Sequence, residues 1–229
     1  MEALVIVHED DSPAGFVGER LEQHGYTLTQ AHIGTALDQG PDELPSLDGF
    51  DLVLPLGCTA GVYERDVAAW MNDEIAFLAE AHRRRVPILG ICFGGQSLAA
   101  ALGARVERAQ QAEIGWIMVE TSDPEAIAPG PWMAWHIDHF EVPFGATELA
   151  RTDRASHAYR LDRSVGLQFH PEVDEALVEL WAKEPPDSYF AGHDADRKAL
   201  LDNLHDNVAS SRTNTFTLVD WFVETVSGS

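Results

Sequence analysis

The sequence contains few cysteines and few lysines. Only two cysteines, Cys58 and Cys92, occur among 229 residues, which is too few for a disulfide framework. Lysine also occurs only twice, and 38 acidic against 15 basic residues give a formal net charge of −23. Because nucleic acids and anionic membranes repel a chain with this charge, we expect neither as a partner. Two isolated thiols fit a reducing compartment most simply, so we expect a cytoplasmic protein.

Short motifs for metals and nucleotides are missing from the sequence. No CxxC, HExxH, GxxxxGK or GxGxxG spacing occurs, so we expect no metal site, no cofactor and no activation of an acceptor by ATP. One uncharged stretch, residues 86–104, is nearly long enough to span a bilayer. Pro87 and four glycines interrupt it, which favours a buried strand–turn–helix over a membrane span. Acids at position 2 and directly after the first apolar run argue against a signal peptide.

The excess of acidic residues has two interpretations. In a salt-rich cytoplasm, screening would reduce the self-repulsion that otherwise opposes a compact state. The other interpretation is an ordinary acidic protein of a mesophile. Composition alone favours neither.

Short apolar runs alternate with helical patterns along the chain. Residues 3–7 and 50–56 have the continuous apolar character of strands covered on both faces. We expect a helix between Ser12, as its N-cap, and Gly25, and the apolar spacing predicts an amphipathic helix over residues 66–85. The apolar face of the second helix would carry Val67, Trp70, Met71, Ile75, Leu78 and Ala81. This order predicts a three-layer α/β fold in which helices flank a largely parallel central sheet.

The C-terminal part of the sequence differs from the rest. From Val173 onward, three helical patterns follow and no strand. We therefore expect residues 1–182 to form one domain and residues 183–229 to form a helical extension that packs on it.

Residues 90–94 have the G-x-nucleophile-x-G pattern of a nucleophile elbow, with Cys92 at its centre. A strand that turns sharply into a helix brings together the residues two before and two after the nucleophile, and side chains there would collide. Cys92 would then project from the sheet edge in a strained conformation, at the start of a helix whose free N–H groups stabilise negative charge. The alternative is a buried cysteine that only packs in a glycine-rich turn.

A base for this thiol is found near residue 170. His170 follows a β-type run, and Glu172 lies two residues further on. Pro171 favours extended geometry at His170, and residues two apart in an extended chain point to the same side. Glu172 could then fix the tautomer of His170 and stabilise its cationic form. Otherwise both are ordinary loop residues after a strand.

Together the two motifs resemble those of the class I, triad-type glutamine amidotransferases. The stretch GICFGGQ, residues 90–96, is similar to the nucleophile motif of that family, and GLQFHPE, residues 166–172, is similar to its His/Glu motif. The resemblance, in particular to the glutaminase domain of guanosine monophosphate synthetases, extends from about residue 50 to His170, with the N-terminal strand in agreement. It implies a flavodoxin-like α/β domain.

The resemblance also implies roles for individual residues. Cys92 would attack the side-chain amide of glutamine, with His170 as general base and then acid and Glu172 as the residue that orients it. Ammonia would leave, and water would hydrolyse the γ-glutamyl thioester. The oxyanion would be held by the backbone N–H of Phe93 and by an N–H of the loop that begins at Gly57.

Two further segments match the family. Gln96 corresponds to a glutamine that contacts the substrate. The segment WHIDHFEVP, residues 135–143, resembles the stretch that lines the glutamine pocket, so Trp135 would line it and Asp138 would meet the α-amino group of the substrate. Because no third ligand accompanies the histidines of this segment, we expect no metal ion there.

The loop at residues 57–59 departs from the family pattern. Family members usually have Gly-Gly-Pro where this chain has Gly57-Cys58-Thr59. Cysteine does not freely adopt backbone angles that glycine tolerates, so Cys58 puts the second oxyanion donor in question. If Cys58 lies near Cys92, the two thiols could form a reversible disulfide; the alternative is that they are neighbours by accident.

Three functions follow from these observations. The first is a glutamine amidotransferase that hydrolyses glutamine and passes ammonia to a synthetase-type protein partner. The second is a hydrolase that uses the same triad on other γ-glutamyl amides or peptides, with the altered loop widening the pocket. The third is a non-catalytic binding module, against which the intact set of Cys92, His170 and Glu172 argues.

Overall fold

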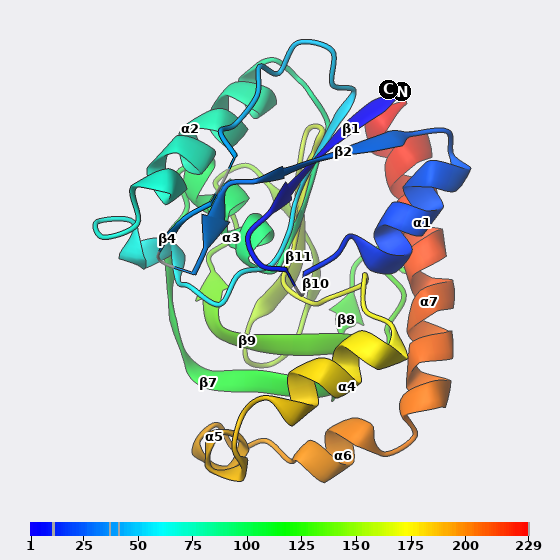
Figure 1. The fold of residues 1–229 in the computed structure, drawn as a ribbon. Helices are drawn as coiled ribbons and strands as arrows, with labels where there is room; N and C mark the ends of the chain where they lie inside the picture. Colours follow the sequence, from blue (N-terminus) through cyan, green and yellow to red (C-terminus); the bar gives the residue numbers. More distant parts are fainter. Residues whose placement is uncertain (11, 37, 41, 229) are drawn as a thin grey trace.

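The chain folds around one eight-stranded sheet (Figure 1). The computed structural model describes residues 1–10, 12–36, 38–40 and 42–228. The strands of the sheet are β1 (Glu2–Val7), β2 (Thr27–His32), β5 (Leu52–Pro55), β6 (Ile88–Ile91), β8 (Glu120–Thr121), β10 (Thr147–Arg151), β11 (Ser156–Leu161) and β12 (Ser164–Leu167). Their order is β2-β1-β5-β6-β12-β11-β10-β8.

One part of this sheet is parallel and completely covered. Strands β2, β1, β5, β6 and β12 pair in parallel, and β5, β6 and β12 are buried at every residue. Strands buried on both faces require continuous apolar runs, which is why the runs at residues 3–7 and 50–56 form β1 and β5. The three-layer α/β fold with a largely parallel sheet is confirmed. Strands β11, β10 and β8 extend it as an antiparallel edge that was not predicted.

Helices cover both faces of the parallel strands (Figure 1). Helices α1 (Gly15–Gln23) and α7 (Leu204–Trp221) pack on one face, and α2 (Ala69–Arg83) and α3 (Phe93–Ala101) pack on the other. On β1, Val5 belongs to the core under α1 and α7, whereas Leu4 and Ile6 belong to the core under α2 and α3. This alternation is the two-residue period of a strand covered on both sides.

A two-stranded ribbon lies beside the main sheet. It consists of β7 (Val106–Ile117) and β9 (Trp132–Phe140), and the register of their pairing shifts between Arg108 and Glu113. A bridge between Met133 and His170 ties β9 to the chain just after β12. Two small elements complete the loops: the hairpin β3 (Gly34–Thr35) with β4 (Asp38–Gln39), and the 3₁₀ turn η1 (Val62–Glu64).

The C-terminal segment is helical. It contains α4 (Glu175–Lys183), α5 (Asp187–Gly192), α6 (Arg197–Leu201), α7 and the π-helical turn η2 (Phe222–Ser227). Three helical patterns were predicted here, and this number is wrong because α5 and α6 are too short to show a helical period. Helices α4, α5 and α6 share one apolar cluster with Met133 of β9. The division into residues 1–182 and 183–229 stays a prediction.

The first helix begins later than predicted. Ser12 is not its N-cap, because α1 begins at Gly15, which has φ +45°. The Phe16 N–H donates to the Glu172 carbonyl at 2.9 Å, and a Cβ on Gly15 would lie 1.9 Å from that oxygen. The chain therefore turns at Gly15 to dock on the Glu172 segment, and this contact overrides the local capping signal. Gly25, with φ +85°, follows the end of the helix as predicted.

One residue of the second helix was also misplaced. Val67 precedes α2 and is 72% exposed, because the helix starts only at Ala69. Trp70, Met71, Leu78 and Ala81 are buried as predicted, and Ile75 is partly buried. None of the helices in the described part of the chain combines the length and apolar character needed to cross a bilayer.

The two ends of the chain lie next to each other (Figure 1). The Thr27 N–H donates to the Met1 carbonyl at 2.8 Å, and the neighbouring Tyr26 hydroxyl lies 2.9 Å from the Ser227 hydroxyl. Both ends therefore lie where β1 begins, and the opposite edge of the sheet is where the parallel strands end.

Candidate active site

Three of the predicted site residues, and Glu9, which was not predicted, meet where four parallel strands end. Glu9 follows β1, Gly57 follows β5, Cys92 follows β6 and His170 follows β12. All four line one cavity of about 370 Å³, a size typical of pockets that bind small molecules. Open α/β sheets bind ligands at this edge, so the topology explains why segments far apart in sequence converge. Of the predicted residues, those that line the cavity are Gly57, Cys58, Cys92, Gln96, Trp135, Asp138 and His170.

Cys92 occupies a nucleophile elbow. It lies between β6 and α3 with φ 52° and ψ −110°, a strained conformation for a residue with a side chain. A Cβ on Gly90 would lie 2.5 Å from the Gly94 carbonyl oxygen, and a Cβ on Gly94 would lie 2.1 Å from the Pro55 carbonyl oxygen. The predicted collision around the nucleophile is therefore confirmed, and both glycines are required by backbone contacts.

His170 and Glu172 form a buried pair. Nδ1 of His170 lies 2.7 Å from Oε1 of Glu172, and both side chains are at most 5% exposed. Burial alone would lower the pKa of His170, but the charges of Glu172 and Cys92 and hydrogen bonding to both raise that pKa well above its ordinary value. Because Nδ1 is engaged by Glu172, Nε2 is the ring nitrogen left for the thiol.

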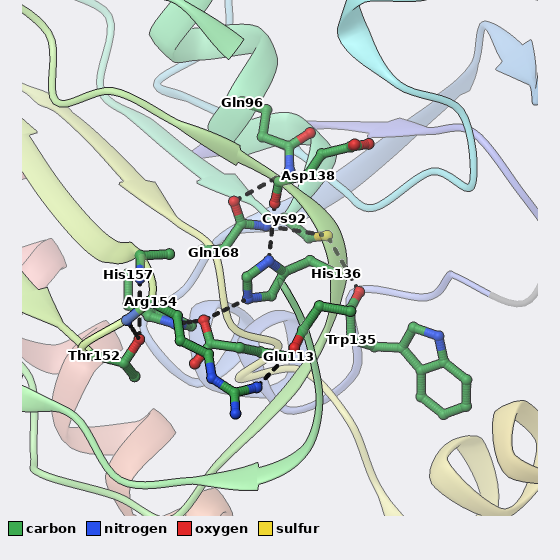
Figure 2. Close-up of polar contacts among 12 residues, drawn as sticks. Cys92, Gln96, Glu113, Trp135, His136, Asp138, Thr152, Arg154, His157 and Gln168 are labelled. Atoms are coloured by element: carbon green, nitrogen blue, oxygen red, sulfur yellow. Dashed lines mark hydrogen bonds and ion pairs between the residues drawn. The ribbon is translucent and has the colours of Figure 1, made fainter. Parts of the chain in front are cut away.

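Gln168 belongs to this site although it was not predicted. Its Nε2 lies 3.7 Å from Cys92 Sγ, and its Oε1 accepts a hydrogen bond from Gln96 Nε2 at 3.1 Å (Figure 2). The alternation of an extended chain contained the signal, because Gln168 lies two residues before His170 as Glu172 lies two after it. Gln96 therefore reaches the site in contact with Gln168.

The backbone of the loop after β5 lies close to the imidazole of His170. A Cβ on Gly57 would lie 3.4 Å from Cε1 of His170. The His8 ring holds this loop, since Nδ1 lies 3.2 Å from the Gly57 carbonyl oxygen and Nε2 lies 2.7 Å from Oε2 of the buried Glu74. Fixing the carbonyl also fixes the plane of the peptide that joins Gly57 to Cys58, and with it the direction of the Cys58 N–H.

Cys58 fits this loop without a left-handed backbone. Among the described residues it is not one of those with positive φ, so the structure shows no backbone strain where cysteine replaces glycine. Glu9 accepts a hydrogen bond from the Thr59 N–H at 2.8 Å and lies 3.7 Å from Cys58 Sγ. Burial raises the pKa of the Cys58 thiol. Cys58 and Cys92 are both free thiols in this structure.

Residues 135–138 of β9 form one wall of the cavity. The Trp135 carbonyl oxygen lies 4.0 Å from Cys92 Sγ. Oδ1 of Asp138 accepts a hydrogen bond from the Tyr63 hydroxyl at 3.0 Å, and burial raises the pKa of Asp138. The Trp135 ring stacks on Tyr189 of α5, so the C-terminal helices close this side of the pocket.

Three buried side chains meet at this wall. Oε2 of Glu113, from β7, lies 2.9 Å from Nε2 of His157, from β11, and 3.4 Å from Nε2 of His136, from β9 (Figure 2). Burial alone would raise the pKa of Glu113, but the two imidazoles hold it well below its usual range; burial also lowers the pKa of His157. Sequence reasoning found no partner for His136, because Glu113 and His157 come from other strands. His139 lies apart from this group, with Nε2 3.6 Å from Glu107.

A family comparison identifies the chain. The model of the class-I glutamine amidotransferases matches residues 58–177, which is more than half of the 229 residues. The chain belongs to the class-I glutamine amidotransferase family. The matched segment of this amidotransferase includes the elbow, the ribbon and the His170–Glu172 pair.

Curated relatives of this amidotransferase are larger proteins. A GMP synthase [glutamine-hydrolyzing] of Stenotrophomonas maltophilia is 42% identical over a 107-residue alignment that covers 40% of this chain and 20% of that protein. One of Vibrio vulnificus is 34% identical over 97 residues, 38% of this chain and 19% of that protein. The chain thus matches about a fifth of the length of these relatives.

Solved structures match the amidotransferase over almost its whole length. A glutamine amidotransferase from Thermotoga maritima has a TM-score of 0.84 at 25% identity and covers 98% of this chain and 99% of its own. A glutamine amido transferase from Methylobacillus flagellatus has a TM-score of 0.83 at 23% identity, with 98% and 95% covered. The fold with its helical C-terminal segment is therefore shared with these proteins.

Proposed function

We propose that this amidotransferase hydrolyses the side-chain amide of glutamine through a thioester on Cys92 and supplies the ammonia to an unidentified acceptor enzyme. The observation that carries the proposal is the pairing of His170 with Glu172 at 2.7 Å in the cavity wall that also presents Cys92. A thiol at a strained helix start beside a carboxylate-oriented imidazole is the arrangement that acyl transfer needs.

The reaction would proceed in two halves. His170 takes the proton of Cys92, and the thiolate attacks the amide carbon of glutamine. The resulting imidazolium gives its proton to the leaving nitrogen, so ammonia departs and the γ-glutamyl thioester remains. A water molecule, deprotonated by His170, then attacks the thioester; the C–S bond breaks, glutamate is released, and the imidazolium returns the proton to the sulfur of Cys92. Glu172 stabilises the cationic imidazole in both halves.

Two backbone N–H groups would stabilise the tetrahedral intermediate. Phe93 is the first residue of α3, and an N–H at that position has no partner within its helix. The second donor is the Cys58 N–H, whose orientation is set by the contact of His8 with the Gly57 carbonyl. Loss of one such donor costs about 10²–10³ in rate.

The rest of the pocket suits the polar end of an amino acid. Asp138, which lines the cavity, would bind the α-amino group, and Gln96 and Trp135 would form the neighbouring surface. The acceptor would be a synthetase-type protein partner, as the names of the curated relatives suggest. Two free cysteines also suit a reducing cytoplasm.

A second candidate is hydrolysis of other γ-glutamyl amides or peptides by the same residues. The observation that favours it is the aromatic wall of the cavity, where Trp135, Trp181 and Tyr189 stand beside Glu184 and Pro185. Such a wall could receive a substituent on the amide nitrogen.

One experiment tests both candidates. Release of glutamate from glutamine and from γ-glutamyl peptides would be measured for the unmodified chain, for Cys92→Ser and for Cys58→Ser, which keeps the backbone N–H proposed as the second oxyanion donor. We expect glutamine turnover that Cys92→Ser abolishes. Faster turnover of the peptides would favour the second candidate. A glutamine-like electrophile should label Cys92 even when turnover is slow without a partner; labelling that persists in Cys92→Ser would refute the assignment.

A further inference from the structure

The group formed by Glu113, His136 and His157 differs from the other buried His–Glu contacts of the chain. In the His8–Glu74 contact, both ring nitrogens of His8 lie near an acceptor, at 3.2 and 2.7 Å. His136 is different: its Nε2 is buried and has no hydrogen-bond partner among the described residues, although it lies 3.4 Å from Glu113. Buried polar atoms without a partner are costly, so this nitrogen requires an explanation.

The tautomer of His136 determines what Nε2 presents to Glu113. Nδ1 lies 2.9 Å from the Asp138 carbonyl oxygen, and a carbonyl only accepts, so Nδ1 carries the hydrogen. A neutral His136 therefore presents the lone pair of Nε2 to the carboxylate of Glu113. Two acceptors then face each other in a buried site, an arrangement that either a second proton on His136 or a bound cation relieves.

The spacing of the donor atoms fits a transition metal. One oxygen and two imidazole nitrogens, from Glu113, His136 and His157, all lie within 4.8 Å of one another. Zn²⁺ binds nitrogen and oxygen ligands at about 2.0–2.2 Å with tetrahedral angles, which places neighbouring ligand atoms roughly 3.3–3.5 Å apart. The Glu113–His136 separation of 3.4 Å already has this value, and the Glu113–His157 separation of 2.9 Å is that of a hydrogen bond whose proton a metal would replace.

The surroundings of the group also resemble those of a metal site. The Asp138 carbonyl orients His136 through Nδ1, as outer partners of metal-bound histidines do. The ligands come from three strands, β7, β9 and β11, which fix their directions. Glu113 stands where the β7–β9 pairing resumes after its register shift.

We propose that Glu113, His136 and His157 bind a divalent transition-metal ion, best suited to Zn²⁺, with a fourth position taken by water. The ion would sit behind the cavity wall and join the Trp135–Asp138 segment to β7 and β11 (Figure 2). Its role is structural: it holds the wall whose Trp135 carbonyl approaches Cys92. Two histidines and one carboxylate with an open position are a common Zn²⁺ ligand set.

The test uses the full chain carrying Cys92→Ser, so that the nucleophile cannot bind the metal and the result does not depend on glutaminase activity. Metal-free protein would be titrated with Zn²⁺ and, separately, with Co²⁺. We expect one ion per chain, and for Co²⁺ a visible spectrum of tetrahedral nitrogen and oxygen ligation without a sulfur charge-transfer band. At a Zn²⁺ concentration about 100-fold above Kd, Tm should rise by about 5–10 °C.

Variants locate the site. Glu113→Gln and His157→Gln should each weaken binding at least ~10²-fold, whereas His139→Gln, on the same strand as His136 but outside the group, should bind as the parent does. If Glu113→Gln does not fold, the proposal is tested by the affinity of His157→Gln for the metal and by the cobalt spectrum of the Cys92→Ser chain. Less than a tenth of an ion per chain, a sulfur band, or unchanged binding by both variants would overturn the proposal and leave a hydrogen-bonded group without a metal.

Discussion

The replacement of Glu172 by glutamine tests the proposed catalytic pair most directly. The variant keeps the size of the side chain and removes the charge that lies 2.7 Å from His170 Nδ1. A hydrogen bond to a charged group contributes about 1.5–3 kcal/mol, and one pKa unit corresponds to about 1.36 kcal/mol. The pKa of His170 should therefore fall in the variant, because the carboxylate charge that raises it is gone. If the same energy is lost in the transition state, kcat should fall about 10- to 150-fold.

The direction of the pH effect follows from the raised pKa of His170. The stabilisation that the pair gives the folded state is complete below the ordinary pKa of histidine and is lost as pH rises through the raised value. The imidazolium that would protonate the leaving nitrogen in the proposed mechanism disappears over the same range. In Glu172→Gln, the alkaline fall of both activity and stability should therefore move to lower pH.

The assay follows glutamate release, and the rate of Cys92 labelling by a glutamine-like electrophile, as functions of pH. Glu175→Gln is the matched control, because Glu175 also lies 2.6 Å from a histidine, His205, but in an exposed pair. The control should keep the parent profile. A Glu172→Gln enzyme with activity within twofold of the parent and an unmoved alkaline limb would refute the role given to Glu172.

Three further predictions concern the elbow, the pocket and the charge of the chain. Gly94→Ala places a Cβ 2.1 Å from the Pro55 carbonyl oxygen, so we expect the free energy of unfolding to fall by about 3 kcal/mol or more and Tm to fall by at least about 6 °C. The control is Gly192→Ala, where the described structure leaves the new Cβ without a neighbour within 4 Å. Equal Tm values for the two variants would contradict the argument. Asp138→Asn should raise KM for glutamine about tenfold or more, because it removes the charge proposed to bind the α-amino group. Since burial raises the pKa of Asp138, KM of the parent protein should also rise as pH falls through that pKa. A KM independent of pH would count against this contact. With a net charge of −23, Tm should rise in molar salt, where the Debye length shrinks to about 3 Å; an unchanged Tm would favour the mesophile interpretation of the acidic surface.

The parts of the site that were predictable from sequence are those encoded locally. The elbow around Cys92 requires glycines at fixed offsets, and the pair of His170 and Glu172 requires only an extended chain. Their meeting follows from a general property of parallel sheets, since strands β6 and β12 end at the same edge. Gln168 lies two residues before His170 on the same side of the extended chain, so the two-residue alternation could also have predicted it as a site residue.

The parts that were not predictable depend on tertiary contacts. The group of Glu113, His136 and His157 exists only because the register of β7 against β9, and the position of β11, bring three distant segments together; no spacing in the sequence encodes that register. The start of α1 was misplaced for a similar reason, because the turn at Gly15 is imposed by the Glu172 carbonyl and not by its own neighbours in sequence.

The adjacent ends of the chain have a practical consequence for these measurements. Strand β1 runs for six residues from Glu2, beside both ends, to Val7, beside the cavity, and at about 3.3 Å per residue this separates them by roughly 20 Å. A purification handle or a surface tether attached at residue 1 or 228 would therefore lie far from the cavity that contains Cys92. Protein immobilised at either end should therefore leave the cavity accessible to substrate. The edge of the sheet that carries the cavity would also remain free for an acceptor enzyme to dock.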